Sequence, residues 1–403
     1  MTSTGYVSKD RDVLIECLAV GGLVDTNDRG LIRRSEDNGA SWQTVEQLTA
    51  QRQIIGDLVE VTLMPSVFSC DPQSGRLFRV FHIHLNKPNV VPWDYAVHPT
   101  WRTIRPYSQV SRDEGQSWSD PVPVVVQGDQ FDASHWCPGI WQGKNGGVLG
   151  ATPIISGGKG VHIAPLCSNQ LFTNGDIIDP DADPATANPD GAVEWQGSCL
   201  HAKWLPDGSG LTWNAGEKVR LPRKYSCDGA DEPSVDYLPD GRLFMILRAR
   251  TYPHTGQELP GMHYYALSED DGMTWAEPEP LLFDDGGYAK SPACISNVLR
   301  SNKNDRFYVI TNFTDQSPVN CDPRNELYIA EIDPERCRIK KSTMTIIDQQ
   351  PLERNIRYSN WRYYQDRRSG NVMLFMTPSC PETVELDAGL APHAYRYEIE
   401  LPD

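Results

Sequence analysis

One stretch of the chain places a carboxylate and a guanidinium where a single hairpin would bring them together. Residues 231–248 contain a predicted strand, the turn Asp240–Gly241 and then a strongly apolar strand, the pattern of a β-hairpin. Glu232 stands before the first strand and Arg248 ends the second, so we expect both at the same rim. A carboxylate can transfer a proton and a guanidinium can bind a carboxylate. A plain surface salt bridge is the alternative interpretation.

Two later segments add residue types that suit the same chemistry. Arg324 follows Asp322–Pro323 and opens an apolar strand after the predicted strand 307–312. Tyr358, in the run 356–361, precedes another strand, a turn and a further strand at 371–375. Each also has a structural explanation, because arginines often begin strands and tyrosines often pack in them.

A repeated octapeptide indicates which elements position these residues. Ser-x-Asp-x-Gly-x-Ser/Thr-Trp occurs at 35–42, 111–118 and 268–275, and a degraded copy lies at 208–213. Aspartate, serine and glycine in this order favour a tight turn, and the tryptophan packs back as an anchor. The second separation is about twice the first, and the degraded copy falls inside it. The repeats therefore predict a repeated structural unit.

The octapeptide resembles the Asp box of the sialidase superfamily, where it forms the turn between the third and fourth strands of a propeller blade. The resemblance implies an all-β chain, a six-bladed β-propeller of four-stranded antiparallel blades. It also implies one domain over residues 1–403, because the repeats show no linker between them. Boxes lie at the periphery of such propellers, so they predict fold and not chemistry.

The segments between the boxes resemble the catalytic segments of sialidases. By that resemblance Glu232 is the base, Tyr358 the nucleophile, and Arg248 and Arg324 hold the substrate carboxylate. A neutral tyrosine avoids the repulsion that an anionic nucleophile would meet at a carbon bearing a carboxylate. The two arginines would bind the substrate carboxylate by charge-assisted hydrogen bonds.

The sequence departs from the family in its first quarter. Sialidases open with an Arg-Ile-Pro phrase whose arginine completes the clamp, and this chain has no such phrase. Arg11 and Arg34 are the possible substitutes. Where the family has its acid aspartate, this chain has Met64, and a thioether cannot donate a proton.

Other residues could supply the missing acid or base. His82 and His84 share one face of a predicted strand, and histidine titrates near neutral pH. Two histidines without a third ligand are a weak metal signal, so we predict no metal and no cofactor. The candidates are Asp57, His82, His84, Asp132 and His135, with Asp94 as a further loop aspartate.

Charge and composition exclude several kinds of partner. The formal net charge of −17 argues against nucleic acid and anionic membranes as partners, and no apolar run predicts membrane insertion. Residues 1–6 do not resemble a signal peptide. We expect a cytoplasmic protein, or a secreted or periplasmic one if residues before Met1 have been removed. The ten cysteines are scattered singly, which favours free thiols over metal sites.

Three functional hypotheses follow. The first is an exo-glycoside hydrolase acting on a terminal acidic sugar of a glycan, either sialic acid-like or another carboxylated sugar. The second is a polysaccharide lyase acting on a uronic-acid-containing glycan, which would use histidine and tyrosine as acid and base. The third is a glycan-binding propeller without catalysis, favoured by Met64.

Overall fold

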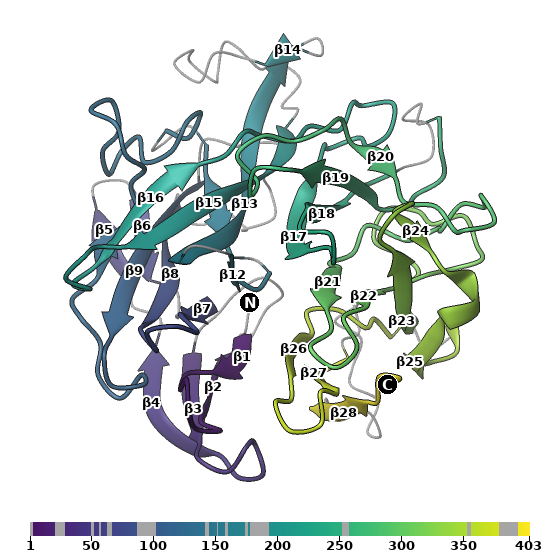
Figure 1. The fold of residues 1–403 in the computed structure, drawn as a ribbon. Helices are drawn as coiled ribbons and strands as arrows, with labels where there is room; N and C mark the ends of the chain where they lie inside the picture. The colour runs from purple at the N-terminus through teal and green to yellow at the C-terminus, as the bar shows by residue number, and fades with distance from the viewer. Residues whose placement is uncertain are drawn as a thin grey trace, which may run out of the picture. The chain divides into compact units, whose positions relative to one another are not determined.

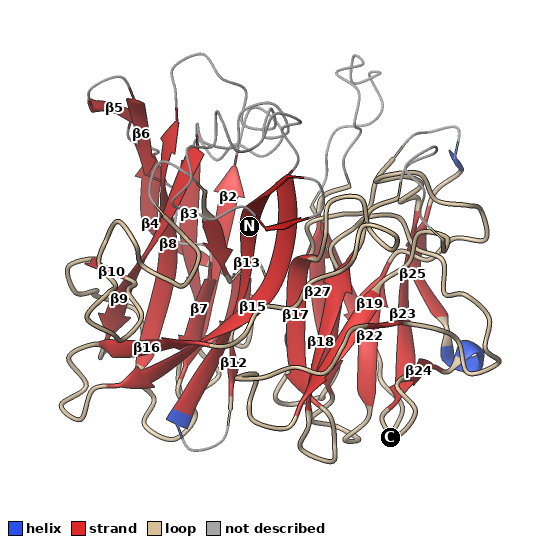
Figure 2. Cartoon of the chain, turned by 90° about the horizontal axis from the view of Figure 1, so that it is seen from above, coloured by secondary structure: helices blue, strands red, loops and turns tan. Residues whose placement is uncertain are grey.

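The structure is a computed structural model that describes most of the chain. The described residues are 3–20, 29–49, 52–55, 58–62, 67–86, 102–141, 145–150, 152–157, 160–173, 176–177, 193–251, 258–352, 356–378 and 394–403. They form strands and loops, with a short 3-10 helix at Lys341–Thr343 (Figure 2). The all-β prediction is confirmed.

The chain divides into two compact units, Met1–Lys218 and Val219–Asp403. Each holds three antiparallel sheets, so the boundary falls between sheets and not within one. Figure 1 labels most strands of each unit.

The first sheet of the first unit has the order β1-β2-β3-β4. The second has the order β10-β9-β8-β6-β5, with β7 also paired with β8; the third has the order β11-β13-β15-β16, with β12 and β14 paired with β13. The bounds are β1 (Ser3–Tyr6), β2 (Leu14–Val20), β3 (Arg29–Ser35), β4 (Gln43–Thr49), β5 (Arg52–Ile55), β6 (Leu58–Thr62), β7 (Val67–Cys70), β8 (Leu77–Asn86), β9 (Arg102–Ser111), β10 (Val122–Pro123), β11 (Gly147–Leu149), β12 (Ile155–Ser156), β13 (Val161–Thr173), β14 (Asp176–Ile177), β15 (Val193–Trp204) and β16 (Leu211–Ala215).

The second unit begins with a four-stranded sheet, β17-β18-β19-β20, followed by β21-β22-β23-β24 with β25 paired with β23. Its last sheet has three described strands, β26-β27-β28, where four were predicted. The bounds are β17 (Asp231–Tyr237), β18 (Leu243–Arg248), β19 (Tyr264–Ser268), β20 (Glu279–Pro280), β21 (Asn297–Arg300), β22 (Phe307–Thr311), β23 (Glu326–Asp333), β24 (Arg338–Ile339), β25 (Thr345–Gln349), β26 (Arg362–Gln365), β27 (Val372–Met376) and β28 (Tyr395–Ile399).

The repeated octapeptides occupy equivalent turns with the same hydrogen bonds. Each joins the last two strands at one edge of its sheet, β3–β4, β9–β10 and β19–β20. In the second copy, Asp113 accepts the backbone N–H of Ser117 at 2.8 Å and its hydroxyl at 2.6 Å. Gly115 has a φ of +80°, which favours glycine. The degraded copy likewise joins β15 and β16, the last two strands at one edge of their sheet.

The cores lie along the central strands of the sheets. All six residues of β18 are buried, and its apolar side chains contribute Phe244 and Ile246 to a core cluster with Phe307 and Val309 of β22. The continuous apolar run of β18 fits a strand covered on both faces. This buried strand fixes the position of Arg248 at its end.

The described residues also bear on the expectations for membrane insertion and for the cysteines. No helix in the described part of the chain is long and apolar enough to cross a membrane. The nine cysteines within it are free thiols, most of them buried, as the scattered spacing predicted.

Candidate active site

The β17–β18 hairpin brings Glu232 and Arg248 together. Asp231 pairs with Arg248 in the ladder, while Tyr237 and Leu243 pair at the other end beside the turn. Arg248 Nη1 donates to Glu232 Oε2 at 2.6 Å. The side chain of Glu232 is 27% exposed and that of Arg248 is 11% exposed. The predicted placement of both residues at one rim is thus confirmed.

A β-bulge sets the direction of Glu232. The pairing of β17 with β18 is irregular between Asp231 and Ser234, and Glu232 has a φ of +43°. Side chains normally alternate along a strand, but here two successive carboxylates reach one guanidinium, because Asp231 Oδ2 lies 3.7 Å from Arg248 Nη1. Left-handed backbone at a residue other than glycine is strained, and such strain is typical of functional sites.

Three arginines keep Glu232 ionised. Burial opposes its charge, but Arg248, Arg324 and Arg250 together outweigh burial and lower the pKa of Glu232 below its usual value. Glu232 is therefore a carboxylate at neutral pH, able to accept a proton or to stabilise a cation.

Arg250 is not among the residues predicted from the sequence. It pairs with Asp228, with Nη1 3.0 Å from Oδ2. Its spacing from Arg248 was an available signal, because side chains two residues apart point to the same side of an extended chain. The apolar strand pattern ends at Arg248, and for that reason Arg250 was missed.

Arg324 differs from these arginines in its partners. Its Nη1 donates to the hydroxyl of Ser359 at 2.9 Å, and its Nη2 donates to the backbone carbonyl of Ala293. Its Nε is buried and has no hydrogen-bond partner among the described residues. The nearby Asp322 is instead held by Arg357 Nε at 2.7 Å. Within the described chain, therefore, Arg324 donates its hydrogen bonds only to neutral acceptors, while its charge also acts on Glu232 and Cys294.

A buried polar cluster adjoins the Ala293 segment that Arg324 contacts. Nε2 of His263 lies 2.7 Å from Thr311 Oγ1, 3.0 Å from Ser291 Oγ and 3.7 Å from Cys294 Sγ. Burial opposes the thiolate of Cys294, but the His263 contact lowers the pKa of the thiol to about 6. This cluster anchors the segment whose Ala293 carbonyl accepts from Arg324.

Tyr358 is not paired with Glu232. Its backbone N–H donates to the Arg324 carbonyl at 2.8 Å, but the ring is 1% exposed and packs in an apolar cluster of the second unit. Burial raises the pKa of Tyr358 to about 12; the nearby Asp348 carboxylate adds to this increase, and a hydrogen bond between the hydroxyl and Gln350 opposes it. The predicted Tyr358–Glu232 pair is therefore corrected, because the ring is held by apolar packing and its hydroxyl by Asp348 and Gln350.

Arg11 and Arg34 form ion pairs with the octapeptide turns of the first unit. Both interact with Glu114 of the second octapeptide and with Glu36 of the first. Arg34 is 9% exposed and also donates to the Glu114 carbonyl. These ion pairs give both arginines a structural role, which is to hold the two turns.

The described acid and base candidates of the first unit lie on different elements, His82 in β8 and Asp132 and His135 in the loop after β10. His82 is buried, and its Nε2 accepts the N–H of Leu149 at 3.0 Å, which gives it a packing role. Backbone pairing places His84 opposite Ile104, and its side chain lies outside the described residues, as do Asp57, Met64 and Asp94. No group of three His, Cys, Asp or Glu side chains in the described chain could hold a metal ion.

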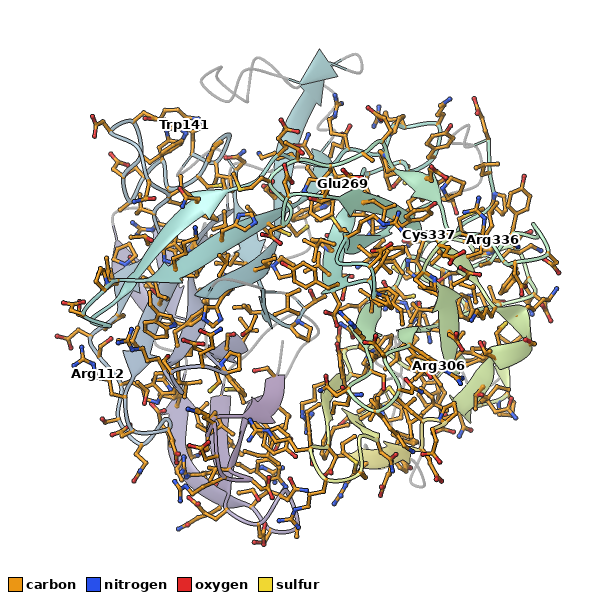
Figure 3. All side chains as sticks on the ribbon, viewed as in Figure 1. Arg112, Trp141, Glu269, Arg306, Arg336 and Cys337 are labelled. Atoms are coloured by element: carbon orange, nitrogen blue, oxygen red, sulfur yellow. The ribbon has the colours of Figure 1, made fainter. Side chains whose placement is uncertain are left out.

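Asp132 and His135 form one loop after β10. Asp132 Oδ1 accepts the N–H groups of Ser134 and His135 at 2.7 and 2.8 Å. These backbone hydrogen bonds lower the pKa of Asp132, which disfavours it as a proton donor. The ring of His135 stacks on Trp141 with centroids 3.6 Å apart; Trp141 is labelled in Figure 3.

No protein-family model matches the sequence, and no curated protein sequence matches it significantly. Solved structures do match its fold. A Hadza microbial sialidase matches with a TM-score of 0.58 and 14% identity over 93% of this chain, which spans only 63% of that sialidase. The NanB sialidase from Streptococcus pneumoniae matches with a TM-score of 0.58 and 11% identity, covering 99% of this chain and 68% of that one.

An α-L-arabinofuranosidase from Fusarium graminearum matches with a TM-score of 0.55 and 14% identity, covering 99% of this chain and 92% of that one. Identities this low show the fold alone. The six sheets are the blades of a β-propeller, and the resemblance to the sialidase superfamily is confirmed at the level of fold.

Proposed function

We propose that the chain is a glycoside hydrolase that removes a terminal carboxylate-bearing sugar from a glycan. One observation carries the proposal: among the described residues the half-buried guanidinium of Arg324 donates only to neutral acceptors, and it lies close enough to the ionised Glu232 to lower the pKa of that carboxyl. An anionic ligand would complete that arrangement, because charge-assisted hydrogen bonds are the strongest that a guanidinium makes. The sialidases and the arabinofuranosidase of the same fold are glycosidases, which supports this reaction class.

The charged residues of the site have different roles, with the arginines binding or orienting and the glutamate reacting. Arg324 holds the substrate carboxylate, and Arg248 keeps Glu232 ionised and oriented. Glu232 is the catalytic carboxylate, which accepts a proton or stabilises the cationic transition state of glycoside cleavage. Tyr358 takes no reacting role in this scheme, because its hydroxyl interacts with Asp348 and Gln350.

A neutral furanoside is the second candidate substrate. Arg248 and Arg250 are already paired with Glu232 and Asp228, which leaves these two arginines less available to a substrate anion. The arabinofuranosidase match, which covers almost all of both chains, favours the same candidate.

A panel of aryl glycosides tests the proposal. It contains sialic acid, Kdn, Kdo and hexuronic acid glycosides, with an α-L-arabinofuranoside as the neutral member. We expect turnover of at least one acidic glycoside and its loss in Glu232→Gln. Turnover of the furanoside alone would select the second candidate. No turnover of any member by folded protein would refute both, and an unsaturated product absorbing in the ultraviolet would identify a lyase instead.

A further inference from the structure

We propose that Asp231 is a positioning residue that holds the catalytic carboxylate of Glu232 in place. This inference rests on the proposed function of Glu232. Two contacts carry it: Asp231 Oδ1 accepts the backbone N–H of Glu232 at 2.8 Å, and Asp231 Oδ2 lies 3.7 Å from the Arg248 Nη1 that also binds Glu232.

The backbone of Glu232 needs such a support. Left-handed backbone is unfavourable for any residue other than glycine, and glutamate gains little from local side-chain hydrogen bonds in that conformation. Among the described non-glycine residues with positive φ, Glu232 is the one inside a strand; the others lie in turns or loops. The hydrogen bond from its own N–H to Asp231 stabilises the bulge where the ladder with β18 is interrupted.

Asp231 also fixes the guanidinium that aims Glu232. Arg248 Nη1 lies between the two carboxylates, 2.6 Å from one and 3.7 Å from the other. Its Nη2 donates to Cys321 Sγ at 3.6 Å. Because several contacts fix the guanidinium of Arg248, it does not move with the Glu232 side chain. Arg248 therefore restrains the orientation of the Glu232 carboxylate.

The two carboxylates are not equivalent. The side chain of Asp231 is 13% exposed and that of Glu232 is 27% exposed, so Glu232 is the more accessible to a substrate. One Asp231 oxygen is already used by the backbone. Asp231 therefore acts through Glu232 and Arg248 and not on the sugar itself.

Two substitutions separate the contributions of Asp231. Asp231→Ala removes the acceptor and the charge, whereas Asp231→Asn keeps a carbonyl oxygen that can still accept the Glu232 N–H. We expect kcat to fall about 10- to 100-fold in Asp231→Ala, the effect of a misplaced catalytic group, with KM changed less than about threefold. Asp231→Asn should keep kcat within about fivefold of the native enzyme. Both should move the acidic limb of the pH profile to lower pH, because loss of a neighbouring anion lowers the pKa of Glu232.

Asp240→Ala is the matched control. Asp240 accepts the N–H of Arg242 at 3.0 Å at the opposite end of the same hairpin, so its loss should leave kcat and the pH profile unchanged. Crystal structures of both Asp231 variants give a readout independent of turnover. We expect negative φ at residue 232 in Asp231→Ala and a retained left-handed bulge in Asp231→Asn.

The outcomes distinguish this inference from the proposed function. A native enzyme that turns over no glycoside refutes the proposed function, while φ at residue 232 still tests the support given by Asp231. Equal kcat in Asp231→Ala and Asp240→Ala would overturn the inference, as would an unchanged left-handed φ in Asp231→Ala. If Asp231→Ala does not fold, the inference fails should Asp231→Asn lose kcat as fully as Glu232→Gln.

Discussion

The imidazole of His162 should make the first unit sensitive to mild acid. His162 lies in β13 and is 1% exposed. Its Nε2 accepts the indole N–H of Trp204 at 3.2 Å, so its Nδ1 carries the proton and faces Ser69 Oγ at 2.9 Å. Protonation at Nε2 would break the Trp204 bond, and burial outweighs the attraction of Asp71 and lowers the pKa of His162 from 6.5 to about 4.

The sign and size of the effect follow from that lowered pKa. Above pH 6.5 the imidazole is neutral in the folded and unfolded chains, and it contributes no pH dependence. Between pH 6.5 and 4 the imidazole of His162 is protonated in the unfolded chain but stays neutral in the folded chain. The unfolding free energy therefore decreases as the pH falls. At pH 4.5 the loss is about 2.5 kcal/mol, because a tenfold difference in proton affinity between the folded and unfolded chains corresponds to about 1.4 kcal/mol.

Urea unfolding at pH 7.0 and 4.5 measures this loss in the native protein and in His162→Gln. Glutamine keeps an acceptor for Trp204 but does not titrate. We expect the native protein to lose about 2.5 kcal/mol more than the variant over this range. Parallel losses, equal within about 0.5 kcal/mol, would refute the reasoning, as would a His162 NMR resonance that titrates near pH 6.5.

Three further predictions concern the site and the sheets. Arg324→Gln should raise KM for an acidic aryl glycoside about 100-fold while changing kcat far less, because a hydrogen bond to a charged group contributes about 1.5–3 kcal/mol. Steady-state kinetics measures this effect, and equal KM values in the native enzyme and the variant would contradict it. Burial outweighs the hydrogen bonds to Asp236 and raises its pKa to about 6, so its proton stabilises the fold at low pH and that stability is lost as pH rises from about 4 to 6. Asp236→Asn should lack this decrease of up to about 3 kcal/mol in urea titrations, and an identical pH dependence would exclude it. Asp113→Ala should lower the unfolding free energy by about 1 kcal/mol, since Ser117 loses both of its bonds to that carboxylate; an unchanged urea midpoint would argue against it.

The sequence was sufficient to predict the sheets because its signals are local. The octapeptide carries its own hydrogen bonds within eight residues, so each copy forms the same turn in a different sheet. The hairpin that carries Glu232 and Arg248 is equally local, since the Asp240–Gly241 turn sets its register.

The roles of single side chains depend on contacts that the pattern does not encode. The sequence order suggested a nucleophile at Tyr358, but the rotation of a residue just before a strand is set by the apolar cluster beside it. The sequence predicts His82 as a candidate acid, but its Nε2 accepts the N–H of Leu149, which lies on another sheet. The left-handed backbone of Glu232 has no residue-type signal, because glutamate is not a residue that this conformation favours.

Each of the six sheets is made from one unbroken run of the chain. Among the described strands, none is borrowed from a distant part of the sequence. This local pairing keeps the sequence separation between paired strands short for an all-β protein, and short separations favour fast folding. The order of synthesis can therefore also be the order of pairing, with each sheet finding its partners before the next one has left the ribosome. A segment inserted between two sheets would lengthen the chain without interrupting any ladder.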